Sequence, residues 1–187
     1  MTNDDIAKLG PLAPLAGVWE GGQGTDTAPD DDRGTEINEY RERLVLEPIG
    51  AVENHEQKLQ GLRYATTAWR LGEDDPFHEE LGYWLWDARA RQVLRCFMVP
   101  RGVTVIAGGT VEPDATSFTL AAEVGSETYG ICSNRFLDRE FKTVRYELAF
   151  ERRDTNTIHY REDTVLKIRG LDELFHHTDE NTLTRIA

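Results

Sequence analysis

The strongest constraint on this chain is an alternation of apolar and polar residues that returns in segment after segment. In residues 143–152, Val144, Tyr146, Leu148 and Phe150 occupy every second position, which is typical of a strand with one buried face. Roughly ten such segments follow residue 19, and the turns between them are too short to hold a helical spacer. Strands joined by short turns pair antiparallel, so the sequence predicts an all-β fold built as an antiparallel meander.

The meander is expected to close into a barrel, because closure leaves no exposed strand edge. A barrel of roughly ten strands has room for one small ligand, so the predicted fold is a lipocalin-like or fatty-acid-binding-protein-like barrel. The length suits a single domain over residues 1–187, with short helical turns within residues 4–16. A two-sheet sandwich is the alternative architecture.

A tryptophan between glycines opens the strand region. Trp19 lies within residues 17–24, where the glycines allow sharp bends and close approach of another strand. We expect Trp19 to plug one end of the barrel; the alternative is a glycine-rich entry into an edge strand. Four further side chains are expected to line the barrel: Leu62, Tyr64, Trp84 and Trp86. Residues 77–87 are aromatic on both faces, which leaves open which face is inside.

The charge balance limits the partners of the chain. It has 21 Lys and Arg against 34 Asp and Glu, for a net charge of −13. Phosphate contacts need clustered Lys and Arg, so nucleic acid and anionic membrane surfaces are not expected partners. A small anionic ligand remains open, because an arginine inside the barrel can pair with a carboxylate. The candidates within strands are Arg63, Arg95, Arg145 and Arg161.

The N-terminal residues 1–5 are acidic and lack the basic start and apolar core of a signal peptide. No apolar run reaches the length of a membrane span. We therefore expect a cytoplasmic protein, in which Cys96 and Cys132 are reduced and structural.

Common catalytic motifs are incomplete. Ser126 lacks the second glycine of a nucleophile elbow, and His78 is not followed by the second histidine of a zinc helix. The acidic residues 30–32 lack the spacing of a calcium loop and are expected to form a solvated loop. No hydrolase, phosphate-loop, zinc-helix or calcium-loop site is therefore predicted.

The histidines are the remaining candidates for chemistry. His176 and His177 are adjacent on an extended segment, so one can face inward while the other faces solvent. Imidazole is the usual protein ligand of heme iron, and an inward histidine near the open end of a barrel could supply that bond. The alternative is that both are polar residues at a strand end, one of them bonded to Asp179 or Glu180. His78, at the start of a strand, could bond across the barrel rim and touch a ligand.

Three motifs together resemble the nitrobindins, a family of heme-binding β-barrel proteins. They are Leu-Ala-Pro-Leu-Ala-Gly-Val-Trp-Glu-Gly at residues 12–21, Phe-His-Glu-Glu-Leu-Gly-Tyr at residues 77–83, and the hairpin at residues 99–110. The chain departs from the family at residues 27–32, which are acidic where the family carries Tyr-Pro-Thr, and this favours a divergent branch.

The resemblance implies a ferric heme b near one opening of the barrel, with an apolar distal side suited to binding nitric oxide and isomerising peroxynitrite to nitrate. It assigns the proximal iron bond to His177, with His176 as the second choice. The cofactor-binding residues expected on this basis are His177, His176, His78, Trp19, Tyr64 and Trp84. The expected partner is heme or a small apolar molecule, and a homodimer is one expected assembly.

Two other functions stay open. One is a non-enzymatic carrier or sensor of a lipid-like or other apolar molecule, in which an internal arginine holds a carboxylate and no heme is bound. The other is a protein-interaction barrel whose interior is closed and filled.

Overall fold

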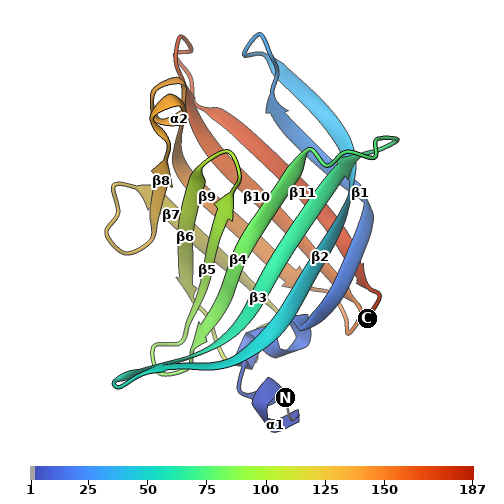
Figure 1. Cartoon of the computed structure of the whole chain (residues 1–187), viewed down its shortest axis with the longest axis vertical. Coiled ribbons are helices and arrows are strands. Elements are labelled where there is room, and N and C mark those ends of the chain that lie inside the picture. The colour runs from blue at the N-terminus through green and yellow to red at the C-terminus, as the bar shows by residue number, and fades with distance from the viewer. Residues whose placement is uncertain (1–2) are drawn as a thin grey trace.

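The computed structural model describes residues 3–187, so residues 1 and 2 of the acidic N-terminal start lie outside the described residues. Residues 3–187 form a closed barrel of eleven strands, which confirms the predicted all-β fold (Figure 1). The strands are β1 (Gly17–Pro29), β2 (Thr35–Asn54), β3 (Gln57–Arg70), β4 (His78–Asp87), β5 (Gln92–Val99), β6 (Val103–Thr110), β7 (Ser117–Val124), β8 (Gly130–Ser133), β9 (Phe141–Arg152), β10 (Thr157–Ile168) and β11 (Phe175–Arg185).

Pairing of the first and last strands closes the barrel. Trp19 of β1 lies opposite Arg185 of β11, and Thr27 lies opposite Thr178. Figure 1 shows blue β1 running alongside red β11. Since both edges of the sheet are satisfied in this way, the closure removes the exposed edges that a flat meander would leave.

One pair of strands departs from the predicted antiparallel pattern. The short strand β8 pairs in parallel with β7, Glu123 lying opposite Gly130, and pairs antiparallel with β6, Val103 lying opposite Ser133. Between β6 and β7 themselves the described pairing is limited to Gly108 and Ala121. β8 therefore fills a gap where β7 diverges from β6.

The short helices lie at the two ends of the barrel, with α1 (Asn3–Ala7) and η1 (Gly10–Leu15) at one end and α2 (Arg135–Glu140) near the other (Figure 1). The sequence predicts a loop over residues 134–140, lying between two strands, and this prediction is wrong because α2 forms there. The Asn134 side chain caps α2, because its Oδ1 accepts hydrogen bonds from the backbone N–H groups of Phe136 and Leu137.

From the proline and glycine at residues 48–50 the sequence also predicts a turn there, and this prediction is wrong. The chain passes through these residues within β2, and a register shift between Pro48 and Gly50 marks a bulge. Gly50 has a φ of 82°, a left-handed conformation that glycine adopts without steric cost. The hairpin turns instead at residues 55–56, between β2 and β3.

The end of the barrel beneath η1 is filled. Leu12, Leu15 and Trp19 are completely or almost completely buried, and the Trp19 indole donates a hydrogen bond of 2.8 Å from Nε1 to the carbonyl oxygen of Leu15. A side chain at Gly10 (φ +57°) would collide with the ring of Trp86. Each buried leucine contributes about 1.5–3 kcal/mol through removal of its surface from water. Trp19, the residue expected to plug one end of the barrel, therefore fills this end together with η1.

Candidate functional site

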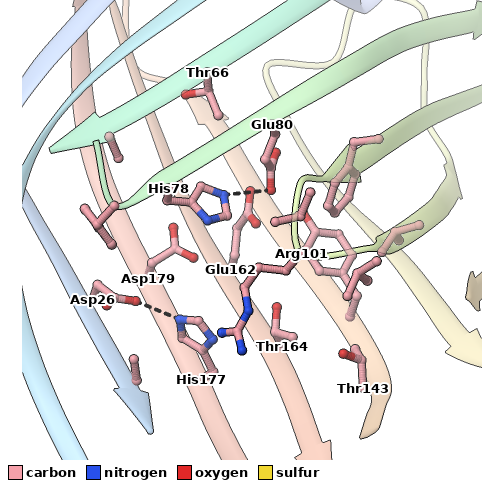
Figure 2. A pocket seen from close by; sticks show the side chains of 18 of the residues that line it. Asp26, Thr66, His78, Glu80, Arg101, Thr143, Glu162, Thr164, His177 and Asp179 are labelled. Atoms are coloured by element: carbon pink, nitrogen blue, oxygen red, sulfur yellow. Dashed lines mark hydrogen bonds and ion pairs between the residues drawn. The ribbon is translucent and has the colours of Figure 1, made fainter. Parts of the chain in front are cut away.

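A cavity of about 500 Å³ lies inside the barrel toward the end that carries α2. Its volume falls within the range of small-molecule pockets, which is about 300–1,000 Å³. Its mouth is bordered by the β1–β2 loop, the β5–β6 turn and α2, with Asp30, Arg101 and Leu137 among its lining residues. Figure 2 shows a group of these side chains from close by.

One wall of the cavity is apolar. It is built by inward positions of β5, β6, β9 and β10, together with α2. The residues of this wall near the mouth are Val99, Val103, Leu137, Phe141 and Leu166, and those deeper in the barrel are Phe97, Val105, Leu148 and Phe150. Trp84, expected to line the barrel, lies among the deeper residues and is buried.

The middle of the cavity carries a buried ionic cluster around Arg95. Its Nη2 lies 2.6 Å from Oε2 of Glu80, and its Nη1 donates to Glu162 and to the hydroxyl of Tyr146. The guanidinium also lies 4.7 Å from the ring centre of Phe97. Both carboxylates and the guanidinium are buried, so this cluster depends on complete mutual pairing.

The two glutamates of this cluster differ in pKa. Burial alone would raise the pKa of Glu80, but the charge of Arg95 and the hydrogen bonds from His78 and Tyr64 lower it to about 2. For Glu162, burial raises the pKa, the charge of Arg95 lowers it and that of Glu80 raises it again, so the net shift is upward. One arginine thus shares its charge between two carboxylates, and the net shift in pKa is downward for Glu80 and upward for Glu162.

A second polar group surrounds Glu42. Its carboxylate accepts hydrogen bonds from Thr66 (2.7 Å), Tyr160 (2.6 Å) and Asn181 (3.2 Å). Burial raises the pKa of Glu42, and these three hydrogen bonds offset only part of that rise. Asp179 faces the same cavity, and burial together with the charges of Glu162 and Glu42 raises its pKa well above the usual range.

The adjacent histidines of β11 point to opposite sides of the barrel wall. His177 lines the cavity, and its Nε2 lies 2.7 Å from Oδ1 of Asp26, whose other carboxylate oxygen accepts a hydrogen bond of 3.1 Å from Asn38. His176 is exposed on the outer face, where its Nδ1 lies 2.8 Å from Oδ2 of Asp163. Of the two, only His177 can meet a ligand in the cavity.

His78 lines the cavity at the start of β4, and its Nε2 lies 3.3 Å from Oε1 of Glu80 (Figure 2). Burial would lower the pKa of His78, but the hydrogen bond and charge of Glu80, with the charges of Glu162 and Glu42, raise it overall. His78 and His177 are the histidines that line the cavity within residues 3–187, and each is bonded to a carboxylate.

The other residues expected at the site lie at different depths. Tyr64 is buried behind the cavity wall and donates a hydrogen bond of 2.9 Å to Glu80. Trp19 lies at the filled end beneath η1, away from the cavity lining. Among the four candidate arginines, Arg95 points inward, whereas the side chains of Arg63 and Arg145 are exposed and pair with glutamates on the outer face, and Arg161 is exposed.

Sequence reasoning missed several acidic residues of the cavity. Glu42 has the parity of Leu44 and Leu46, and Glu162 has the parity of Ile158, so each continues the inward face of its strand. Asp179 follows His177 at the same parity on β11. Extending the alternating inward pattern beyond the apolar residues of each strand would have identified all three acidic residues.

The side chains of the mouth fit a heme with one adjustment. They provide an imidazole on β11, an apolar wall for the porphyrin ring, and arginines near the mouth for the two carboxylates of the group. The adjustment concerns His177. Because Asp26 occupies its Nε2, iron must either bind Nδ1 or displace Asp26.

The acidic side chains at the mouth limit where the carboxylates of a bound group can lie. Among residues 3–187 the cavity lining includes eight acidic side chains and three arginines, and Asp30, Asp31 and Glu36 lie at the mouth. A bound group with carboxylates must therefore place them away from β1 and β2, next to a cation.

Comparison with known proteins supports a heme-binding barrel. Residues 8–185 match the family model described as a THAP4-like, heme-binding β-barrel domain. Among solved structures, the chain is similar to the crystal structure of Rv2717c from M. tuberculosis, with a TM-score of 0.66 and 21% sequence identity over 94% of this chain and 95% of that chain. A search of curated proteins found no match.

Proposed function

Because the chain belongs to the THAP4-like heme-binding β-barrel domain family, we propose that it holds a heme b at the mouth of its cavity, with His177 as the axial ligand. The observation that carries this proposal is the position of His177 on β11, facing the cavity opposite an apolar wall. His176, the second choice, is turned outward and paired with Asp163.

The residues of the chain have separate roles in this proposal. His177 would supply the iron ligand, and Val103, Phe141 and Leu166, which line the same cavity, would keep water away from the bound group. Asp26 is the neighbour of His177 that affects how readily the imidazole binds iron, because its carboxylate is bonded to Nε2 and competes for that nitrogen. When bound, ferric heme would supply nitric oxide binding and the isomerisation of peroxynitrite to nitrate.

The region below the mouth is more polar than the apolar distal side that the resemblance to nitrobindins implies. His78, which lines the cavity, offers its imidazole to a small anion such as peroxynitrite. For this reason we propose isomerisation as the activity to test first, and nitric oxide binding as the second.

Titration of the purified protein with hemin tests the cofactor directly. We expect a saturable one-to-one change in the Soret band in the wild type and in His176→Ala, and loss of the histidine-ligated spectrum in His177→Ala. The His176 variant is the matched control, because it removes the neighbouring imidazole from the outer face. Unchanged spectra in His177→Ala would contradict the axial assignment, and a non-saturating wild-type response would contradict heme binding.

A carrier of an apolar carboxylate is the second candidate, favoured by the apolar wall and the volume of the cavity. The inward arginine that the sequence suggested for this role, Arg95, is already bonded to Glu80 and Glu162. A carrier would therefore have to hold its carboxylate elsewhere in the cavity. Displacement of an uncharged fluorescent probe by fatty acids, unaffected in His177→Ala, would favour this candidate.

A further inference from the structure

A single arginine at the mouth of the cavity stands out by its lack of partners. Three arginines line the cavity within residues 3–187. Arg95 is bonded to Glu80 and Glu162, and Arg70 bonds Asn38 at 2.9 Å and lies over the ring of Phe77. The structure shows no ion pair or hydrogen bond for the third guanidinium, that of Arg101, to any residue from 3 to 187.

The backbone around Arg101 is held in place. Arg101 lies in the turn between β5 and β6, where Gly102 N–H donates to the carbonyl oxygen of Val99 at 2.9 Å. Asn134, the residue that caps α2, donates from Nδ2 to the carbonyl oxygen of Arg101 at 2.6 Å and from its backbone N–H to that of Gly102 at 2.9 Å. The turn is thereby tied to α2, so the arginine extends from a fixed base.

The side chain of Arg101 extends into the cavity, as Figure 2 shows. Its neighbours on the same turn and on the start of β6, Val99 and Val103, belong to the apolar wall. The acidic residues of the mouth lie mainly on β1, β2 and the loop between them, including Asp26, Asp30 and Glu36. Arg101 therefore provides an unpaired positive charge at the edge of an apolar surface.

We propose that Arg101 is the anion-binding residue of this cavity and pairs with a carboxylate on an otherwise apolar ligand. A guanidinium binds a carboxylate through two parallel hydrogen bonds, and an unpaired guanidinium can do so without first losing a partner. The carboxylate is a heme propionate if the proposed function holds, and this form of the inference rests on that function. In the absence of heme, the same pairing fits the carboxylate of a fatty acid.

The first arm of the test compares hemin with hemin dimethyl ester, which lacks both charged carboxylates. We expect Arg101→Ala to weaken hemin binding about tenfold, the effect of losing one charge-assisted hydrogen-bonded pair. Binding of the dimethyl ester should change less than about twofold, because the ester carries no charge for the guanidinium to pair with. The Soret band of bound hemin should keep its histidine-ligated form, since His177 is unchanged.

The second arm uses laurate and dodecanol as competitors for the uncharged dye Nile red. It separates a failure of the heme proposal from a failure of this one, because it requires no heme. We expect Arg101→Ala to weaken displacement by laurate about tenfold and to leave dodecanol unaffected. A wild type that binds laurate but not hemin would overturn the proposed function and keep the role of Arg101.

Arg89→Ala is the matched control, because it removes an exposed arginine from the turn between β4 and β5, away from the cavity lining. Arg101→Lys keeps the charge and should retain part of the preference for the charged ligands. Arg101 is exposed, so its variants are expected to keep the circular dichroism of the wild type. The inference is overturned if Arg101→Ala affects the charged and uncharged ligands equally, or if the wild type prefers neither charged ligand.

Discussion

His177 and Asp26 are joined across the β1–β11 seam, with Nε2 of the imidazole 2.7 Å from Oδ1 of the carboxylate. Asp26 is buried, and the same carboxylate is held by Asn38. The ring of His177 is thus fixed by a residue that also competes for one of its two nitrogens. Whether this pair helps or hinders iron binding can be measured.

Replacing Asp26 by alanine should tighten hemin binding about fivefold, because Nε2 of His177 is released to bind the iron. The measurement is a hemin titration followed in the Soret region. Asp31→Ala is the control, since it removes one mouth carboxylate that has no contact with His177. Weaker binding in Asp26→Ala than in Asp31→Ala would show instead that Asp26 orients the imidazole for the iron.

Replacing Arg95 by methionine should lower the free energy of unfolding by about 3–5 kcal/mol, because two buried carboxylates lose their counter-charge. Urea unfolding followed by circular dichroism provides the measurement. The triple variant Arg95→Met, Glu80→Gln, Glu162→Gln removes the arginine and both of its carboxylate partners together and should recover most of the loss. A single variant as stable as the wild type would mean that the cluster is neutralised by proton uptake.

Glu140 at the end of α2 gives a prediction for pH. Hydrogen bonds from Arg33, Arg139 and Arg169 lower the pKa of its carboxylate to about 2, against 4.5 in an unfolded chain. Between these values the unfolded state binds more protons, so this contribution to stability is complete above pH 4.5 and is lost as the pH falls toward 2.

Glu140→Gln should therefore be less stable than the wild type at pH 6, and the difference should shrink as the pH falls from 4.5 toward 2. Urea midpoints measured across this range provide the test. A difference that stays constant from pH 6 to pH 2 would show that the ionised carboxylate is not the source of the effect.

Trp19→Phe should lower the free energy of unfolding by about 1–2 kcal/mol, because the carbonyl oxygen of Leu15 loses its indole donor and a small void opens beneath η1. Ligand affinity should stay within about twofold of the wild type, since Trp19 lies outside the cavity lining. Thermal unfolding and hemin titration of the same sample check both parts. A large loss of hemin affinity would show that Trp19 contributes to cofactor binding, as expected from the sequence.

The barrel was predictable from the sequence because strand alternation and closure depend on local patterns. The family match confirms the resemblance to heme-binding barrels that the motifs around Trp19 and His78 indicated. The bulge at Gly50 and the helix after Asn134 were missed, since each arises where local turn signals are outweighed by pairing or capping.

The site was harder to predict because it depends on which strands meet across the interior. Alternation placed one of His176 and His177 inward, but the bond to Asp26 joins residues 151 positions apart, and no local pattern reports it. The pairing of Arg95 with Glu80 and Glu162 is equally non-local.

Cytoplasmic location, a single domain over residues 1–187 and a homodimer stay predictions. No helix among the described residues is both long and apolar enough to cross a membrane.

The plug formed by η1 makes the barrel a cup with its opening at the α2 end. With one opening, a bound molecule leaves by the same route through which the next one enters. The first ligand must therefore dissociate before the second can bind. The lifetime of the bound state is thus set by contacts at the mouth, and adding more of the incoming ligand does not shorten it.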